Sequence, residues 1–126
     1  MASATFDLAE ARQFQLRKFE KRRTELDARF DKAWREFEAI VKMIIDKYDP
    51  EAVWQWGSLL KREHFSEISD IDIALAGHIP AERFFKLYGD AMALTFFPLD
   101  IVELDRIDPL HAESIRQKGK LVYARA

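Results

Sequence analysis

Three aspartates lie within or beside apolar, β-branched runs, where acidic side chains are unusual. Asp70 and Asp72 are two residues apart and are followed by the apolar residues 73–75, and Asp100 lies within the similar run 99–102. Because side chains two apart on a strand leave the same face, the first two carboxylates should be neighbours. A divalent cation would offset their repulsion, and Mg²⁺ is commonly held by one or two carboxylates together with substrate phosphates.

The third aspartate extends this pattern if the strand that carries it lies beside the strand of the first two. Three carboxylates on one face can bind two metal ions about 4 Å apart, which stabilises the attacking and the leaving oxygen in nucleotidyl transfer. We therefore expect Asp70, Asp72 and Asp100 to be catalytic and to bind metal. Asp100 is expected to contact only the ion that activates the acceptor.

A glycine and a serine precede these acids, at the end of another expected strand. Gly57 allows the backbone to approach a phosphate closely. Ser58 can cap the following turn or bind a phosphate oxygen, and amides at the start of a helical turn favour an anion. Lys61 or Arg62 could add positive charge near a triphosphate. We expect Gly57, Ser58, Lys61 and Ser69 to contact the nucleotide.

The elements that must position these residues alternate between strand and helix. Apolar alternation and turn residues predict strands at residues 52–56, 71–75 and 99–104, and a short strand or an extended tail at residues 121–123. Helical spacing predicts helices at residues 80–93 and 109–118. This order indicates an α/β or α+β domain with a small mixed sheet flanked by helices. The aromatic side chains expected in its core are Trp54, Trp56, Phe84, Phe85, Phe96 and Phe97.

An N-terminal helical region is expected over residues 1–48, with the core at residues 49–126, in one domain overall. Apolar residues recur there at steps of three, four and seven without proline or glycine, and Asp49-Pro50 ends the pattern. One helix of this length would run to roughly 60 Å, whereas a globule of this chain length is about 35 Å across. The helix must therefore break, protrude or pack on something else, and a break or the start of an exposed arm is expected at residues 17–24. We expect the apolar face of this helix to pack against another copy of the chain or a partner, giving a homo-oligomer.

Composition narrows the class of protein further. There is no cysteine, which excludes disulfides and thiolate metal sites. We see neither a run of 18 apolar residues nor a signal-peptide pattern, and we expect a cytoplasmic protein without a membrane partner. The net charge of −2 argues against direct nucleic-acid binding. We interpret the basic cluster at residues 17–23 as a solvated helix face, because acidic residues are interleaved with it.

Together the motifs resemble the signature of the DNA polymerase beta nucleotidyltransferase superfamily. The resemblance rests on Gly57-Ser58, on Asp70-Ile71-Asp72 and on Asp100 in a later strand, and it is strongest to the minimal nucleotidyltransferases over residues 53–123. It implies a polymerase-beta-like core, two Mg²⁺ ions held by the three aspartates, and ATP or a related triphosphate held by Gly57-Ser58. The sequence departs from the family at residues 59–62, where members usually have an arginine and a glycine in the turn.

The same resemblance implies a reaction and a partner. Minimal nucleotidyltransferases include antitoxins that pair with HEPN-domain ribonuclease toxins, and some of them transfer AMP from ATP to a tyrosine of the toxin. We therefore expect magnesium-dependent transfer of a nucleoside monophosphate, AMP in the first instance, to a hydroxyl of a partner such as a HEPN toxin. The alternative is a weak or inactive antitoxin that neutralises its partner by contact alone. Magnesium-dependent nucleotide binding distinguishes the two.

Overall fold

A computed structural model describes residues 7–126, which fold into helices on both faces of a four-stranded sheet. In chain order the elements are α1 (Leu8–Tyr48), β1 (Ala52–Trp56), the 3₁₀-helices η1 (Ser58–Leu60) and η2 (Arg62–His64), β2 (Ile71–Ala76), α2 (Ala81–Met92), β3 (Leu99–Glu103), α3 (Pro109–Lys118) and β4 (Lys120–Ala124). The expected α+β class is confirmed, and the expected strands and the two later helices are present to within one residue at each end.

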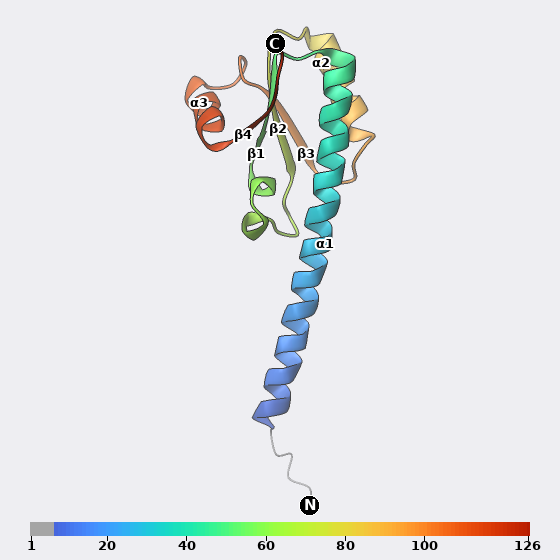
Figure 1. Cartoon of the computed structure of the whole chain (residues 1–126), viewed down its shortest axis with the longest axis vertical. Helices are drawn as coiled ribbons and strands as arrows, with labels where there is room; N and C mark the ends of the chain where they lie inside the picture. Colours follow the sequence, from blue (N-terminus) through green and yellow to red (C-terminus); the bar gives the residue numbers. More distant parts are fainter. Residues whose placement is uncertain (1–6) are drawn as a thin grey trace, which may run out of the picture.

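The sheet has the strand order β3-β2-β1-β4, in which β2 and β3 are parallel and the other pairs are antiparallel. Helices α1 and α2 lie on one side of it and α3 on the other (Figure 1). The larger core lies on the α1 side, and its fully buried members include Ile40, Ile44, Ile71, Ile73, Leu75 and Leu87. A smaller cluster under α3 contains Ala74, Leu104, Ala112 and Ile115.

Helix α1 is one unbroken helix of 41 residues. Asp7 caps its start by accepting a hydrogen bond from the backbone N–H of Ala9 (2.9 Å), and Asp49, in the left-handed conformation, ends it before Pro50. Residues 1–6 of the expected helical region lie outside the described residues. Neither α1 nor any other helix within residues 7–126 is long and apolar enough to cross a membrane.

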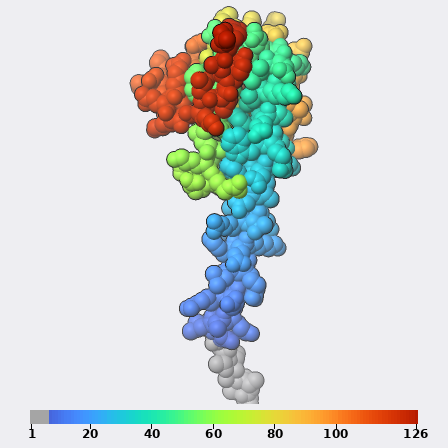
Figure 2. Space-filling model, viewed as in Figure 1, coloured from blue at the N-terminus to red at the C-terminus, as the bar shows by residue number. Residues whose placement is uncertain are grey.

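The two halves of α1 have different surroundings. The second half packs on the sheet and buries Phe30, Ala33, Phe37, Ile40, Val41, Ile44 and Tyr48. Residues 8–25, which we call the arm, leave the folded body, and all of them except Ala11 are exposed (Figures 1 and 2). Of the three outcomes open to so long a helix, the structure shows protrusion without a break at residues 17–24.

Two of the six aromatic residues expected in the core are exposed instead. Phe85 is 78% exposed, because α2 buries Leu87 and Ala91 and so turns this ring outward. Phe96 is 98% exposed in the turn before β3, whereas the next residue, Phe97, is buried. The remaining three residues, Trp54, Trp56 and Phe84, are all half-buried. Aromatic residue type alone therefore predicted too many core residues.

Candidate active site

Strand pairing brings the three predicted aspartates to one end of the sheet. In the parallel pair β2–β3, Asp72 is the register partner of Asp100, and Asp70 immediately precedes the pair Ile71–Leu99. All three acids are half-buried. The neighbouring strands that the sequence required for this grouping are therefore present, and the roles of the carboxylates as metal ligands stay a prediction.

Gly57 lies at the same end of the sheet and against the same acids. Strand β1 is antiparallel to β2 and places Trp56 opposite Asp72, so that Gly57 follows directly after this pair. Its φ of 81° lies in the left-handed region, and a Cβ at this position would collide with the Asp72 carboxylate. Only glycine fits here. The backbone after it, beginning with Ser58 and η1, therefore starts immediately beside the acids.

The electrostatics of the site show that the acids are close enough to repel one another. The pKa of Asp72 is raised to about 7, chiefly because burial penalises the charged form, and then because Asp100 and Asp70 are negative neighbours. Part of the Asp72 population is therefore protonated near neutral pH. A cation bound among the three carboxylates would relieve the repulsion and displace this proton.

The fit to magnesium depends on what accompanies the ion. Within residues 7–126, no group of three or more acidic or histidine side chains is already arranged to hold a metal ion by itself. Magnesium usually combines one or two carboxylates with phosphate oxygens and water. The paired Asp72 and Asp100, with Asp70 beside them and the Gly57 backbone against the Asp72 carboxylate, fit ions whose coordination is completed by a triphosphate.

The loop between β1 and β2 uses its serines to shape itself. Ser69 is buried, and its Oγ accepts a hydrogen bond from the Ser66 backbone N–H (2.8 Å) and lies 3.4 Å from Ser66 Oγ. This turn leads directly into Asp70. Lys61 is exposed between η1 and η2. Contact of Ser58, Lys61 and Ser69 with a nucleotide remains a prediction.

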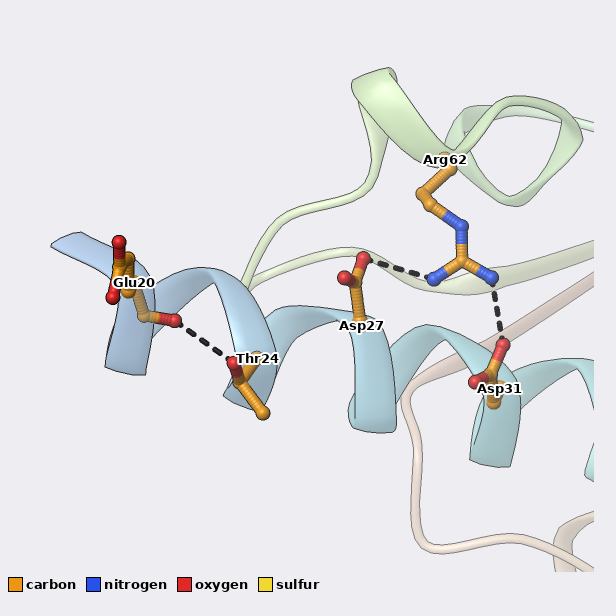
Figure 3. Close-up of polar contacts among 5 residues, drawn as sticks. All are labelled: Glu20, Thr24, Asp27, Asp31 and Arg62. Carbon is orange, nitrogen blue, oxygen red and sulfur yellow. Dashed lines mark hydrogen bonds and ion pairs between the residues drawn. The ribbon is translucent and has the colours of Figure 1, made fainter.

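Arg62, the other basic candidate in the loop, turns toward α1. Its guanidinium donates to Asp27 Oδ1 (2.9 Å) and Asp31 Oδ1 (2.8 Å) (Figure 3). The guanidinium carbon also lies 4.4 Å from the centre of the Phe30 ring. The hydrogen bonds to Asp31 and Asp27 raise the pKa of Arg62. The Arg62 side chain therefore ties the loop to the helix. Of the two basic candidates, Lys61 is the one left to contact a phosphate.

Tyr88 is a residue of the site that the sequence did not reveal. Its hydroxyl donates to the Leu99 carbonyl oxygen (2.6 Å) and accepts from the Ile101 N–H (3.4 Å), the residues on either side of Asp100. Because β3 is an edge strand, this contact satisfies backbone groups that would otherwise be unpaired, and it holds the Asp100 backbone in place. In the sequence, Tyr88 is one more apolar position of a helix, which gives no sign of this role.

Two other polar residues lie outside the site. Glu103 is buried on the face opposite to Asp100, as strand alternation predicts, and pairs with Arg106 (Nε–Oε2 3.1 Å). His111 on α3 packs edge-on against Trp56, with the ring centres 5.4 Å apart. Neither contributes to the group of Asp70, Asp72 and Asp100.

Comparison with known families agrees with this geometry. A family model described as "Polymerase beta, Nucleotidyltransferase" matches residues 38–126. Since this is well over half of the sequence, the chain belongs to the polymerase beta nucleotidyltransferase family, which confirms the resemblance inferred from the motifs. Among curated protein sequences, none matches the chain significantly.

Several solved structures with the same fold are toxin–antitoxin complexes. A complex named MntA–HepT has a TM-score of 0.56 at 17% identity and covers 73% of each chain. A toxin–antitoxin structure with AMP-PNP has a TM-score of 0.60 at 18% identity, covering 71% of this chain and 73% of that one. A third, the tri-AMPylated HEPN toxin of Shewanella oneidensis in complex with its MNT antitoxin, has a TM-score of 0.55 at 17% identity and covers 74% and 73%. At sequence identities this low, the similarity establishes a shared fold and nothing further.

Proposed function

We propose that this chain is a magnesium-dependent, cytoplasmic nucleotidyltransferase that transfers AMP from ATP to a hydroxyl group of a HEPN-type partner protein. The observation that carries the proposal is the pairing of Asp72 with Asp100, with Asp70 and Gly57 at the same end of the sheet. Two of the structures with this fold support the choice of nucleotide and acceptor, because one holds AMP-PNP and another holds an AMPylated HEPN toxin.

Each residue of the site has a distinct role in this proposal. Asp70 and Asp72 would hold both magnesium ions, and the backbone at Gly57-Ser58 would hold the triphosphate with help from the exposed Lys61. When bound, magnesium supplies positive charge that stabilises the phosphates through the reaction. Ser69 and Tyr88 act as positioning residues, because their hydroxyls fix the backbone next to Asp70 and around Asp100.

The transfer itself needs one proton acceptor and one leaving group. The hydroxyl oxygen of the acceptor forms a bond to the α-phosphorus of ATP, and the bond from that phosphorus to the bridging oxygen of pyrophosphate breaks. Asp100 takes up the hydroxyl proton, which then passes to solvent, and pyrophosphate leaves. The products are the AMP ester of the partner and pyrophosphate.

The test is incubation with ATP labelled at the α-phosphate, magnesium and the purified product of the adjacent gene. Label should appear on that protein. Asp72→Asn should abolish both labelling and magnesium-dependent ATP binding, whereas Asp100→Asn should retain binding and lose labelling, because Asp100 serves the acceptor. Asp105→Asn, an exposed acid in the turn after β3, is the matched control and should behave as the wild type.

Other outcomes would separate the alternatives. Efficient labelling of a free aminoglycoside or nucleotide, with none on any protein, would contradict the proposed acceptor. If the wild type neutralises the partner without any labelling, and Asp72→Asn neutralises it equally well, the chain is instead an antitoxin that acts by contact alone.

A further inference from the structure

The arm projects from the end of the sheet that carries the candidate active site. Helix α1 is tied to η2 through the bonds of Asp27 and Asp31 to Arg62, only a few residues after Gly57-Ser58 (Figure 3). Beyond this contact the arm leaves the body and runs past that end of the sheet (Figures 1 and 2). Its length of residues 8–25 corresponds to about 27 Å of helix. The family match begins only at residue 38, so the arm lies outside it.

The apolar stripe of α1 continues uncovered along the arm. At 100° per residue, Leu8 and Phe19 fall within about 40° of the buried Phe30 around the helix axis, as does the half-buried Leu26 just after the arm. Leu8 is 71% exposed and Phe19 is 62% exposed. The face of α1 that packs on the sheet in the second half of the helix is therefore presented to solvent in the first half.

The charges along this stripe indicate what can cover it. Residues 8–25 contain six basic and three acidic side chains; Arg12 and Arg23 fall within the stripe itself, and Arg22 lies at its edge. Two arms paired along the same seam would place Arg12 and Arg23 at core positions, where unpaired guanidinium groups are costly. An acidic partner would instead pair with them. The interleaved acids and the apolar stripe also make the arm a poorer match to a nucleic acid than to a protein helix.

A groove extends the stripe onto the folded body. It has a volume of about 420 Å³ and is lined by Arg23, Leu26, Asp27, Arg62, Glu63 and Phe65. The groove thus joins the root of the arm to the loop that follows Gly57-Ser58. A helix that lies along the stripe and enters this groove would contact the loop that begins at Gly57-Ser58.

We infer that the arm stripe and this groove bind an acidic amphipathic helix of the acceptor protein and hold the acceptor beside Asp100. The apolar face of that helix covers Leu8, Phe19 and Leu26, and its acidic residues pair with the arginines within and at the edge of the stripe. Docking at this surface converts a bimolecular encounter into a positioned reaction. The identity of the docked protein as acceptor rests on the proposed function, whereas the docking chemistry does not.

The direct test uses a synthetic stapled helix with a leucine stripe flanked by glutamates, and a counterpart with lysines in their place. Fluorescence anisotropy with the full chain, without nucleotide, should show binding of the acidic helix and none of the lysine helix. Phe19→Ser should weaken binding about tenfold or more, as expected for the loss of one buried aromatic ring. Phe14→Ser is the matched control, because Phe14 is 57% exposed on the other side of the helix, and it should change the affinity less than twofold.

A second pair of variants separates specific pairing from general charge attraction. Arg22→Glu with Arg23→Glu should abolish binding, whereas Arg17→Glu with Lys21→Glu makes the same change in net charge on the other side of the arm and should preserve it. Equal losses in both double variants would overturn the inference. So would the absence of any binding, tighter binding of a single-stranded RNA at the same surface, or a homodimer in light scattering that Phe19→Ser dissociates.

Failure of this inference and failure of the proposed function give different results. In Asp72→Asn the acidic helix should bind as it does to the wild type, because the site acids take no part in docking. Docking without transfer would leave the surface in place and contradict the proposed reaction. Transfer to the partner protein that is unaffected by Phe19→Ser would support the reaction and contradict the docking surface.

Discussion

The two halves of α1 share one helical period and differ in what covers their apolar face. Ile40 and Ile44 in the second half are completely buried by the sheet, whereas Phe19 in the arm is 62% exposed. Arginines lie within and at the edge of the stripe in the arm, whereas the buried half presents its apolar residues directly to the core. The difference shows that periodicity locates an apolar face of a helix but does not show whether the folded body covers that face.

The largest difference between the halves should be in stability. Ile44→Ala should lower the free energy of unfolding by about 2–5 kcal/mol, because it leaves a cavity between α1 and the sheet. Phe19→Ala should change it by no more than about 0.5 kcal/mol. Urea unfolding followed by circular dichroism measures both. A loss above about 1 kcal/mol for Phe19→Ala would show that the arm is already covered in the isolated protein.

A smaller effect is expected at the point where the halves meet. Arg62→Ala removes both ion pairs to α1 and the contact with the Phe30 ring, and should lower the free energy of unfolding only slightly, because these side chains are about half exposed and solvent screens the ion pairs. Hydrogen exchange should become faster at residues 58–64, and the difference should shrink in 1 M salt. Unchanged exchange in this loop would mean that the ion pairs do not hold it against α1.

The smallest effect concerns pH and should arise in the folded body alone. Because the pKa of Asp72 is raised from its ordinary value of 3.8 to about 7 in the folded state, its contribution to stability is fully present only below about pH 4 and is lost as the pH rises from there through 7. Asp72→Asn should therefore raise the melting temperature by about 2–4 °C at pH 8 and change it little at pH 4. A gain of the same size at both pH values would contradict a titrating Asp72. Removing residues 1–25 should leave this pH difference intact.

The sequence was sufficient for the parts of the site that follow from strand geometry. Asp72 and Asp100 each stand in an alternating apolar run, so a sheet that pairs these runs must place the acids together, and Gly57 ends the adjoining strand. Contacts between residues that lie far apart in the sequence could not be predicted in this way. The turn of Arg62 toward Asp27 and Asp31 and the reach of Tyr88 to the edge of β3 depend on how helices lie on the sheet. The exposure of Phe96 depends on the path of one turn.

The most direct test of the central claim, that the acids at this end of the sheet bind a nucleotide with magnesium, is thermal unfolding with and without Mg-ATP. At a concentration about a hundred times the dissociation constant, binding should add about 2.7 kcal/mol of stability. The account predicts a clear rise in melting temperature for the wild type that requires both magnesium and ATP, and none for Asp70→Asn with Asp72→Asn. The same double variant without ligand should be as stable as the wild type or more so, because a carboxylate repulsion is removed. An equal rise in the double variant, or a clear loss of its stability without ligand, would contradict the account.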